Sequence, residues 1–283
     1  MVRVQLPPQL VEDAQAYADG SREPAEPRNA ATVVLMRGGL EGPEVYLLRR
    51  QTSMAFAGGM CVFPGGGVDP RDFDHAVAWA GSPPAEWAAR LGTDEATARA
   101  LVCAAVRETF EESGVLLAGE SGETVVADTT GEDWETDRAA LEARDLSFTD
   151  FLDRRGLVLR SDLLGVWAGW LTPVFEPRRY RTWFFVADLP EGQRTRDVST
   201  ESDQVAWLPA MEAVSDVERE HMLMLPPTYL TCLEIGQYAD PAEVLDAARE
   251  RTVEMFMPQV EEDDAGGTLS IPPRLETLLE TRT

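Results

Sequence analysis

The 283-residue sequence contains no lysine, only two histidines and only three cysteines. All 25 basic residues are therefore arginines, and they face 50 acidic residues, so the formal net charge is −25. Because binding to a nucleic-acid backbone depends on clustered cations, the charge excludes a general nucleic-acid partner. A phosphorylated small molecule would also be repelled unless a metal ion or a local arginine cluster reversed the field.

The cysteines and the apolar segments give two further exclusions. Cys61, Cys103 and Cys232 lie far apart and form no CxxC pair, which predicts neither a zinc site nor a disulfide framework. The N-terminal segment has no apolar core typical of a signal peptide, and no apolar run reaches the ~18 residues of a membrane-spanning helix. We therefore expect a soluble cytoplasmic protein that does not enter a membrane.

Predicted strands and helices alternate along the chain. Strands are expected at residues 30–36, 44–50, 165–171, 181–187 and 203–209, and residues 60–70 are expected to form a short strand that runs into a glycine-rich turn. Helices are expected at residues 7–19, 95–113, 135–144, 148–155, 209–219, 226–237 and 241–256. For the long helix, Asp94 supplies the N-terminal cap and Gly114 the end. This alternation predicts an α/β fold in which helices cover both faces of a mixed sheet.

Composition divides the sequence into three regions. Residues 1–29 form an expected N-terminal helix and polar link, residues 30–258 the main domain, and residues 259–283 an acidic tail. Within the main domain, the stretch from Glu120 to Asp150 holds ten acidic residues and only two arginines. We interpret this stretch, residues 120–150, as a solvated surface excursion.

The segment RETFEESGV, residues 107–115, places like charges on neighbouring turns of the expected helix. Glu108, Glu111 and Glu112 share one face, and each like-charge pair three or four residues apart costs about 0.2–0.5 kcal/mol. One interpretation is a solvated acidic face. The other is a divalent metal site, because Mg²⁺ and Mn²⁺ prefer oxygen ligands and clustered carboxylates supply them.

The pattern R-E-x-x-E-E-x-G in this segment resembles the second half of the Nudix box. The stretch PGGGVDPRD, residues 64–72, resembles the first half, with Gly66 as the glycine that lets the turn pass close to the site. Asp72 stands where the family has a glutamate. Between Asp72 and Arg107 lie 34 residues, a longer spacer than is usual. Long inserts of this kind also occur in coenzyme A diphosphatases of the family.

The resemblance covers roughly residues 30–258. It implies a Nudix-type α/β/α sandwich with a mixed sheet, a long insert at residues 73–106 in the Nudix box, and extra C-terminal helices. The implied activity is that of a Nudix hydrolase, a pyrophosphatase that cleaves a diphosphate linked to another group.

The family pattern also implies roles for individual residues. Mg²⁺ or Mn²⁺ is the implied cofactor, and its implied ligands are Glu111 and Glu112, with Glu108 next. Arg107 is expected to orient a glutamate by pairing with it. The general base stays open, because Nudix enzymes recruit it from different places; the candidates are Glu111, Glu112, Glu201 and Asp203.

The substrate is less closely defined by the sequence. Residues 170–190 and 225–236 resemble segments of the coenzyme A group, so coenzyme A or an acyl-coenzyme A is the preferred substrate. Arg178, Arg179 and Arg181 form the cluster best suited to hold its phosphates, unless they serve as turn residues paired with nearby acids. ADP-ribose or a nucleotide sugar is the alternative substrate. A catalytically inactive Nudix-fold binding or regulatory module is the alternative of another class. Family members are often dimers, so a homodimer is also open.

Overall fold

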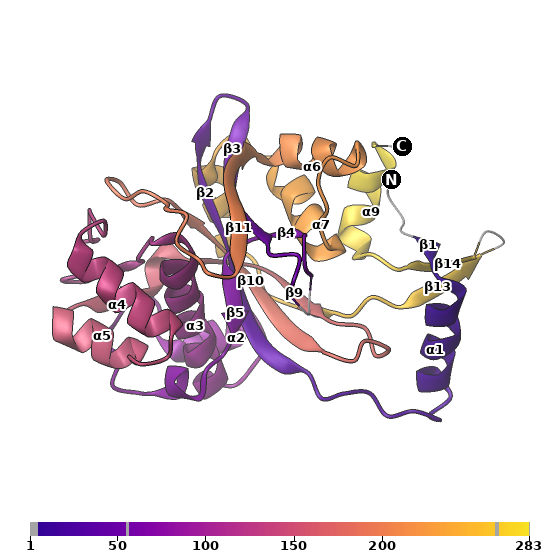
Figure 1. The fold of residues 1–283 in the computed structure, drawn as a ribbon, viewed down its shortest axis with the longest axis horizontal. Helices are drawn as coiled ribbons and strands as arrows, with labels where there is room; N and C mark the ends of the chain where they lie inside the picture. Colours follow the sequence, from indigo (N-terminus) through magenta and orange to yellow (C-terminus); the bar gives the residue numbers. More distant parts are fainter. Residues whose placement is uncertain (1–4, 55–56, 264–265, 283) are drawn as a thin grey trace.

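The computed structural model describes residues 5–54, 57–263 and 266–282, and its centre is a mixed sheet (Figure 1). The strand order is β11 (Ser202–Pro209), β3 (Gly42–Arg50), β2 (Arg28–Gly39), β10 (Tyr180–Asp188), β9 (Gly165–Leu171) and β12 (Met255–Phe256). Two short strands extend it, because β4 (Cys61–Val62) pairs with β3 and β5 (Gly65–Gly67) pairs with β2. The β10–β2 and β12–β9 pairs are parallel, whereas the remaining pairs are antiparallel. The predicted mixed sheet is therefore confirmed.

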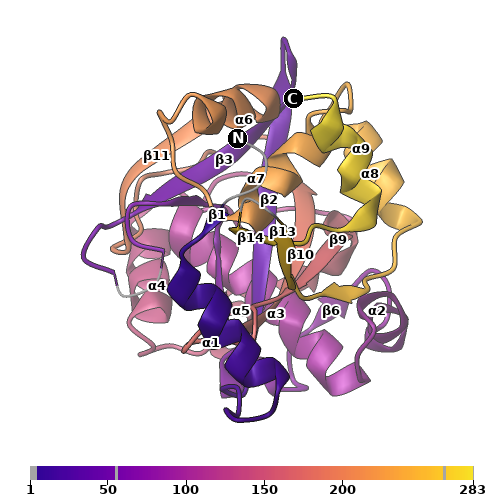
Figure 2. The same cartoon turned by 90° about the vertical axis from the view of Figure 1, so that its right-hand side faces the viewer.

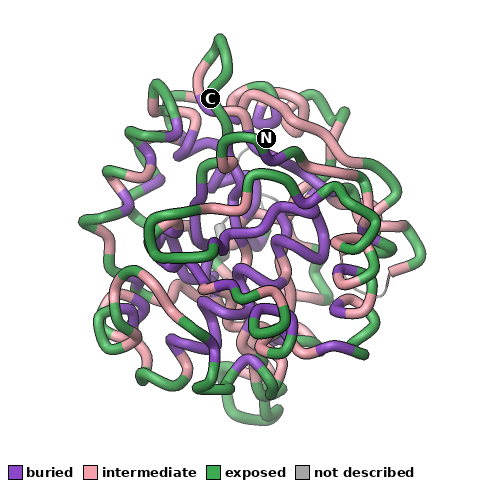
Figure 3. The backbone as a smooth tube through the Cα atoms, turned by 90° about the vertical axis from the view of Figure 1, so that its left-hand side faces the viewer, coloured by how far each residue is buried: buried purple, intermediate pink, exposed green. Residues whose placement is uncertain are grey.

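Helices cover both faces of this sheet, and each face has its own apolar core (Figures 1 and 2). One face carries α2 (Pro84–Leu91), α3 (Glu95–Ser113), α4 (Glu132–Glu142) and α5 (Phe148–Arg155). The other carries α6 (Ala210–Glu218), α7 (Pro226–Ile235), α8 (Pro241–Arg249) and α9 (Pro273–Glu280). Buried backbone accordingly runs through the middle of the molecule (Figure 3). The expected α/β/α sandwich is confirmed.

One helix ends earlier than the sequence predicts. The helix expected over residues 241–256 stops at Arg249, and Met255–Phe256 form strand β12 beside β9. Between them, the backbone N–H of Val253 donates to the carbonyl of Arg90 at 2.8 Å. Thr252 and Val253 are β-branched and favour extended backbone, so a tertiary hydrogen bond and sheet pairing replace the last helical turns.

The insert at residues 73–106 is part of the core. It contains strand β6 (Trp79–Ala80), helix α2 and the first turns of α3, and β6 pairs with β8 (Val158–Arg160). Trp87 is 1% exposed, and its ring centroid lies 6.0 Å from that of Phe185 in the central sheet. The added length therefore covers one face of the sheet with apolar side chains and supports the helix that follows.

The acidic excursion at residues 120–150 packs against the same face. Its Trp134 meets the rings of Phe110 in α3 and Phe151 in α5 edge-on, with centroids 6.3 Å and 6.1 Å apart. Leu141, at 2% exposed, is also buried. The interpretation as a solvated excursion is wrong for this inner face, because apolar residues spaced among the acids form one side of α4 and α5.

The two ends of the described chain meet in a small sheet. Strand β1 (Gln5–Leu6) pairs with β14 (Gly266–Leu269), which pairs with β13 (Val260–Asp263), and α1 (Pro8–Ala18) lies beside them (Figure 2). In α9, Leu275 and Leu279 are 1% and 2% exposed. The described part of residues 259–283 is thus packed rather than a free tail, and the division into three regions stays a prediction. No helix in the described residues is long and apolar enough to cross a bilayer.

Candidate active site

The C-terminal half of α3 carries the acidic cluster. The Asp94 side chain caps the helix by accepting from the N–H of Thr97 at 2.9 Å, and Gly114 ends it with a left-handed φ of 74°. Both ends agree with the sequence prediction. The apolar side of α3 contributes Val102, Val106 and other residues to the core, so its position on the sheet is fixed by burial.

Arg107 is the centre of the cluster. Its guanidinium holds Asp72 through two hydrogen bonds, from Nε at 3.0 Å and from Nη2 at 2.9 Å. Its Nη1 donates to Glu108 at 2.7 Å and to Glu111 at 3.3 Å, and Nη2 also donates to the carbonyl of Gly67 at 3.1 Å. One buried arginine therefore joins the turn of the first half of the motif to the glutamates of the second. Asp72, 2% exposed, serves to hold Arg107.

The glycine turn approaches the Glu108 carboxylate so closely that a side chain at Gly66 would displace it. A Cβ placed on Gly66 would lie 2.5 Å from Oε1 of Glu108, well inside van der Waals contact. The N–H of the preceding Gly65 donates to Oε2 of Glu112 at 2.8 Å. The backbone of β5 thus forms one wall of the glutamate site.

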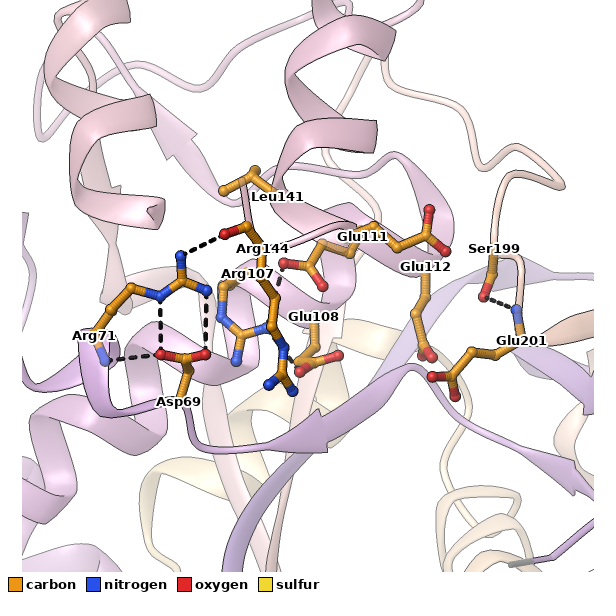
Figure 4. Close-up of a pocket in the computed structure, with 11 residues that line it drawn as sticks. Asp69, Arg71, Arg107, Glu108, Glu111, Glu112, Leu141, Arg144, Ser199 and Glu201 are labelled. Atoms are coloured by element: carbon orange, nitrogen blue, oxygen red, sulfur yellow. Dashed lines mark hydrogen bonds and ion pairs between the residues drawn. The ribbon is translucent and has the colours of Figure 1, made fainter. Parts of the chain in front are cut away.

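A cavity of about 160 Å³ opens over these groups. Figure 4 shows Asp69 and Arg71 at one end, with Glu112 and Glu201 pointing toward one another at the other. The residues that line it are Asp69, Arg71, Arg107, Glu108, Glu111, Glu112, Leu141, Glu142, Arg144, Ser199 and Glu201. The cavity is therefore strongly polar and brings together carboxylates from α3 and from the segment before β11.

The three glutamates of α3 have raised pKa values. Burial raises the pKa of Glu111 to about 7, and the neighbouring charge of Glu108 adds to the rise while Arg107 opposes it. Burial also raises the pKa of Glu108, and it raises that of Glu112 well above the ordinary value with help from the charge of Glu108. Arg107 alone thus does not neutralise the cluster, and a further cation would be stabilised there.

The donor set fits a hard divalent cation. Glu108, Glu111, Glu112 and Glu201 offer only carboxylate oxygens, the ligand type that Mg²⁺ and Mn²⁺ prefer. In their present rotamers, no three acidic, histidine or cysteine side chains among the described residues converge as a coordination group. Glu108 and Glu111 face Arg107, and Glu112 faces the N–H of Gly65.

Two acids before the last strand were expected to compete for the role of general base, and they lie differently. Glu201 lines the cavity, with a side chain that is 52% exposed, and it accepts from Arg50 Nη2 at 2.9 Å. Asp203 pairs instead with Arg49 at 2.7 Å and is not among the residues lining the cavity. Only Glu201 of these two is brought to the glutamates of α3.

The arginines expected to bind substrate do not line the cavity. Arg179 is 7% exposed, and its guanidinium donates to the carbonyls of Thr172 at 3.1 Å and Ala25 at 2.9 Å. Arg181 donates to the side chain of Asn29 at 3.2 Å, and Arg178 is exposed. These contacts hold the β9–β10 turn against the chain before β2. Substrate contact by this cluster stays a prediction.

Two other arginines reach the cavity, and the sequence reasoning missed both. Arg71 donates from Nε and Nη2 to the two carboxylate oxygens of Asp69, and from Nη1 to the carbonyl of Arg144 at 3.0 Å. Arg144 is exposed, has a left-handed φ of 63°, and its guanidinium has no hydrogen bond or ion pair among the described residues. For Arg144 the sequence held a signal, because Arg138 and Arg144 are the two arginines among the ten acidic residues of 120–150.

Comparison with known proteins identifies the architecture. The NUDT19 Nudix domain family matches residues 88–235, slightly more than half of the chain. A Caenorhabditis elegans protein named nudix hydrolase 7 is 26% identical over 75% of this chain and 62% of its own length, so the chain spans less than two-thirds of that relative. The Xenopus laevis acyl-coenzyme A diphosphatase NUDT19 is 23% identical over 81% of this chain and 70% of that protein. Among solved structures, a NUDIX hydrolase from Alicyclobacillus acidocaldarius superimposes with a TM-score of 0.66 at 25% identity, covering 81% of this chain and 99% of that one.

Proposed function

The chain belongs to the NUDT19 Nudix domain family, and on this premise we propose that it hydrolyses the diphosphate bond of coenzyme A or an acyl-coenzyme A with the help of Mg²⁺ or Mn²⁺. The observation that carries the proposal is the cavity that Glu108, Glu111, Glu112 and Glu201 line together, with Arg107 paired to Glu108 and Glu111. Support for the substrate comes from relatives named acyl-coenzyme A diphosphatases. A cytoplasmic location and a homodimer stay predictions.

The glutamates of α3 are the proposed metal ligands. Bound there, the cation would neutralise charge on the phosphoryl oxygens during hydrolysis. Arg107 is a positioning residue, because its guanidinium is fully engaged with Asp72, Glu108, Glu111 and the carbonyl of Gly67. A hydrogen-bonded arginine of this kind keeps the carboxylates within reach of one another while their charges repel.

We assign the general base to Glu201. Its carboxylate is half-exposed on the cavity wall opposite α3, and one oxygen accepts from Arg50 while the other has no partner among the described residues. Water oxygen attacks one phosphorus, a water proton passes to Glu201, and the bridging P–O bond breaks with its electron pair leaving on the departing phosphate. For coenzyme A the two products are 3′,5′-ADP and phosphopantetheine.

The substrate anion needs a cation that is not already engaged. We propose Arg144 for this contact, with Arg71 holding the Arg144 backbone in place. Arginine forks suit phosphate oxygens, and the cavity otherwise presents acids to an anionic substrate. The Arg178–Arg181 cluster would then contact only a distant part of the substrate.

The test is product analysis of purified protein with Mn²⁺ against coenzyme A, acetyl-coenzyme A, ADP-ribose, NADH and a nucleotide sugar. Release of 3′,5′-ADP with a phosphopantetheine product supports the proposal. Release of AMP from ADP-ribose alone keeps Nudix chemistry but replaces the substrate. No product from the folded protein with either Mn²⁺ or Mg²⁺ favours the inactive binding module and overturns the proposal.

A further inference from the structure

The C-terminal end of α3 is capped by residues from two other segments. The last carbonyls of a helix lack partners within it, and α3 has no basic residue in its own last turn. The carbonyl of Glu111 accepts from Nη1 of Arg138 at 2.7 Å. The carbonyl of Ser113 accepts from the N–H of Arg196 at 2.9 Å. The same helix end therefore anchors both the acidic excursion and the segment that leads to Glu201.

Arg138 is held from both sides within α4. It is 4% exposed, and it donates to Glu135 from Nε and Nη2 and to Oε2 of Glu142 at 3.0 Å. Buried arginines are stable only when their donors are paired, so these contacts leave the guanidinium one orientation toward α3.

Glu142 continues the connection to the next segment. Its Oε1 accepts from the N–H of Thr200 at 2.9 Å and from Oγ1 of Thr200 at 2.7 Å. Burial raises the pKa of Glu142, but the hydrogen bonds from Thr200 and Arg138 outweigh this and leave the pKa below its usual value. Glu142 is thus held as a carboxylate between the two partners.

Glu201 follows Thr200 directly. Its N–H donates to Oγ of Ser199 in the same segment at 3.2 Å, and not to a residue of α4. The carbonyl of Thr200 accepts from Nε2 of Gln51 at 2.7 Å. A continuous series of hydrogen bonds consequently runs from the carbonyl of Glu111 through Arg138 and Glu142 to Thr200, the residue before Glu201. We call this series the Arg138–Glu142–Thr200 chain.

We propose that Glu142 and Thr200 are positioning residues that fix Glu201 relative to the glutamates of α3. The inference rests on the proposed function, in which Glu201 accepts the proton. Acids far from the cavity pair with arginine without such a link; Asp137 on the same helix, for example, pairs with Arg155 at 2.7 Å. The acidic excursion thereby has a role at the site: its helix sets the distance across the cavity.

The kinetic test uses variants of the Arg138–Glu142–Thr200 chain and one control variant outside it. Glu142→Ala is expected to lower kcat about 10–100-fold with little change in KM, because small misplacement of a reacting group is costly. Thr200→Val removes the hydroxyl donor and is expected to lower kcat about five- to tenfold, whereas Thr200→Ser restores the donor and most of the turnover. Asp137→Ala removes an ion pair from the other side of α4 and serves as the matched control.

Non-additivity separates positioning from general damage. If Glu142 acts through Glu201, then adding Glu142→Ala to Glu201→Gln causes little further loss. Full additivity of the two losses, or an unchanged kcat in Glu142→Ala, overturns the inference.

A second readout does not depend on the substrate. Amide hydrogen exchange at residues 199–203 is expected to accelerate in Glu142→Ala and Thr200→Val but not in Asp137→Ala. If the wild-type protein cleaves no diphosphate, the proposed function fails on its own, and the assignment of Glu201 as base fails with it. The exchange rates then still show whether the Arg138–Glu142–Thr200 chain holds residues 199–203 in place. Unchanged rates in Glu142→Ala would contradict that role.

Discussion

Residues 107–115 and residues 120–150 are both rich in acids, but their charged side chains differ in burial and in partners. In the first stretch, the carboxylates converge on one buried guanidinium, Arg107, and face a cavity. In the second, many acids are exposed, whereas Arg138 is buried and caps α3, and the exposed Arg144 lines the cavity. In a protein with no lysine and a net charge of −25, the contacts of the arginines therefore distinguish the two acidic stretches better than the number of acids does.

The largest expected effect is on stability, at the centre of the first stretch. Arg107→Met leaves the buried Asp72 and Glu111 and the partly buried Glu108 without their cation, so we expect the free energy of unfolding to fall by about 3–5 kcal/mol. Arg155→Met, at the end of α5, breaks the pairs with Asp133 and Asp137 of the excursion, of which Asp133 is 69% exposed. We expect that loss to be only about 1 kcal/mol. Denaturant unfolding of both variants measures the two losses of stability. Equal losses would contradict the view that the two acidic stretches differ in how their charged side chains are buried and paired.

The next effect is on turnover. Glu111→Gln keeps the shape of the side chain but removes a carboxylate from the cavity, and we expect kcat to fall about 100–1,000-fold, in the range of other lost electrostatic contacts at transition states. Glu132→Gln makes the same change at an exposed site in the excursion and should leave kcat within about twofold of wild type. Steady-state kinetics on the best substrate of the panel provides the comparison. A Glu111→Gln enzyme with wild-type activity would remove this residue from the site.

Metal binding should stabilise the first stretch and not the second. At a Mn²⁺ concentration about 100 times its dissociation constant, linkage predicts about 2.7 kcal/mol of added stability, which appears as a rise in Tm. The rise should disappear with a chelator and shrink strongly in Glu111→Gln, but persist in Glu132→Gln. Thermal unfolding with and without Mn²⁺ checks this. A rise of the same size in all three proteins would indicate binding elsewhere.

The smallest expected effect concerns Arg144 and Arg178, which are both exposed. Arg144 lines the cavity and Arg178 does not, and neither guanidinium has a partner among the described residues. Arg144→Ala should raise KM about tenfold, the equivalent of one charge-assisted hydrogen bond, while Arg178→Ala should change it less than about twofold. A larger effect from Arg178→Ala would return substrate binding to the β9–β10 turn.

Local signals explain what the sequence could predict. The helix over residues 95–113 has a capping aspartate at one end and a glycine at the other, and the structure has the same bounds. The glycine turn and the glutamates were recognisable although 34 residues separate them, because the pattern of each half is short and chemically specific. The contact of Arg107 with Asp72 spans this gap and needed the tertiary structure.

Long-range contacts explain what the sequence could not predict. Three neighbouring arginines looked like an anion site, but Arg179 is held by carbonyls of Ala25 and Thr172, which no spacing rule indicates. Glu201 and Asp203 were both candidates for the general base, with Glu201 kept as the catalytic candidate, and the structure places only Glu201 of these two on the cavity wall. The inward direction of Arg138 follows from the free carbonyl of Glu111 at the end of another helix.

The most direct test is a crystal structure of the protein with Mn²⁺, in which anomalous scattering locates the metal. We predict a peak inside the cavity, within about 2.0–2.6 Å of carboxylate oxygens from Glu108, Glu111 or Glu112. A peak outside the cavity, or none there in crystals of a Mn²⁺-dependent active enzyme, would contradict the assignment of these glutamates as the metal site.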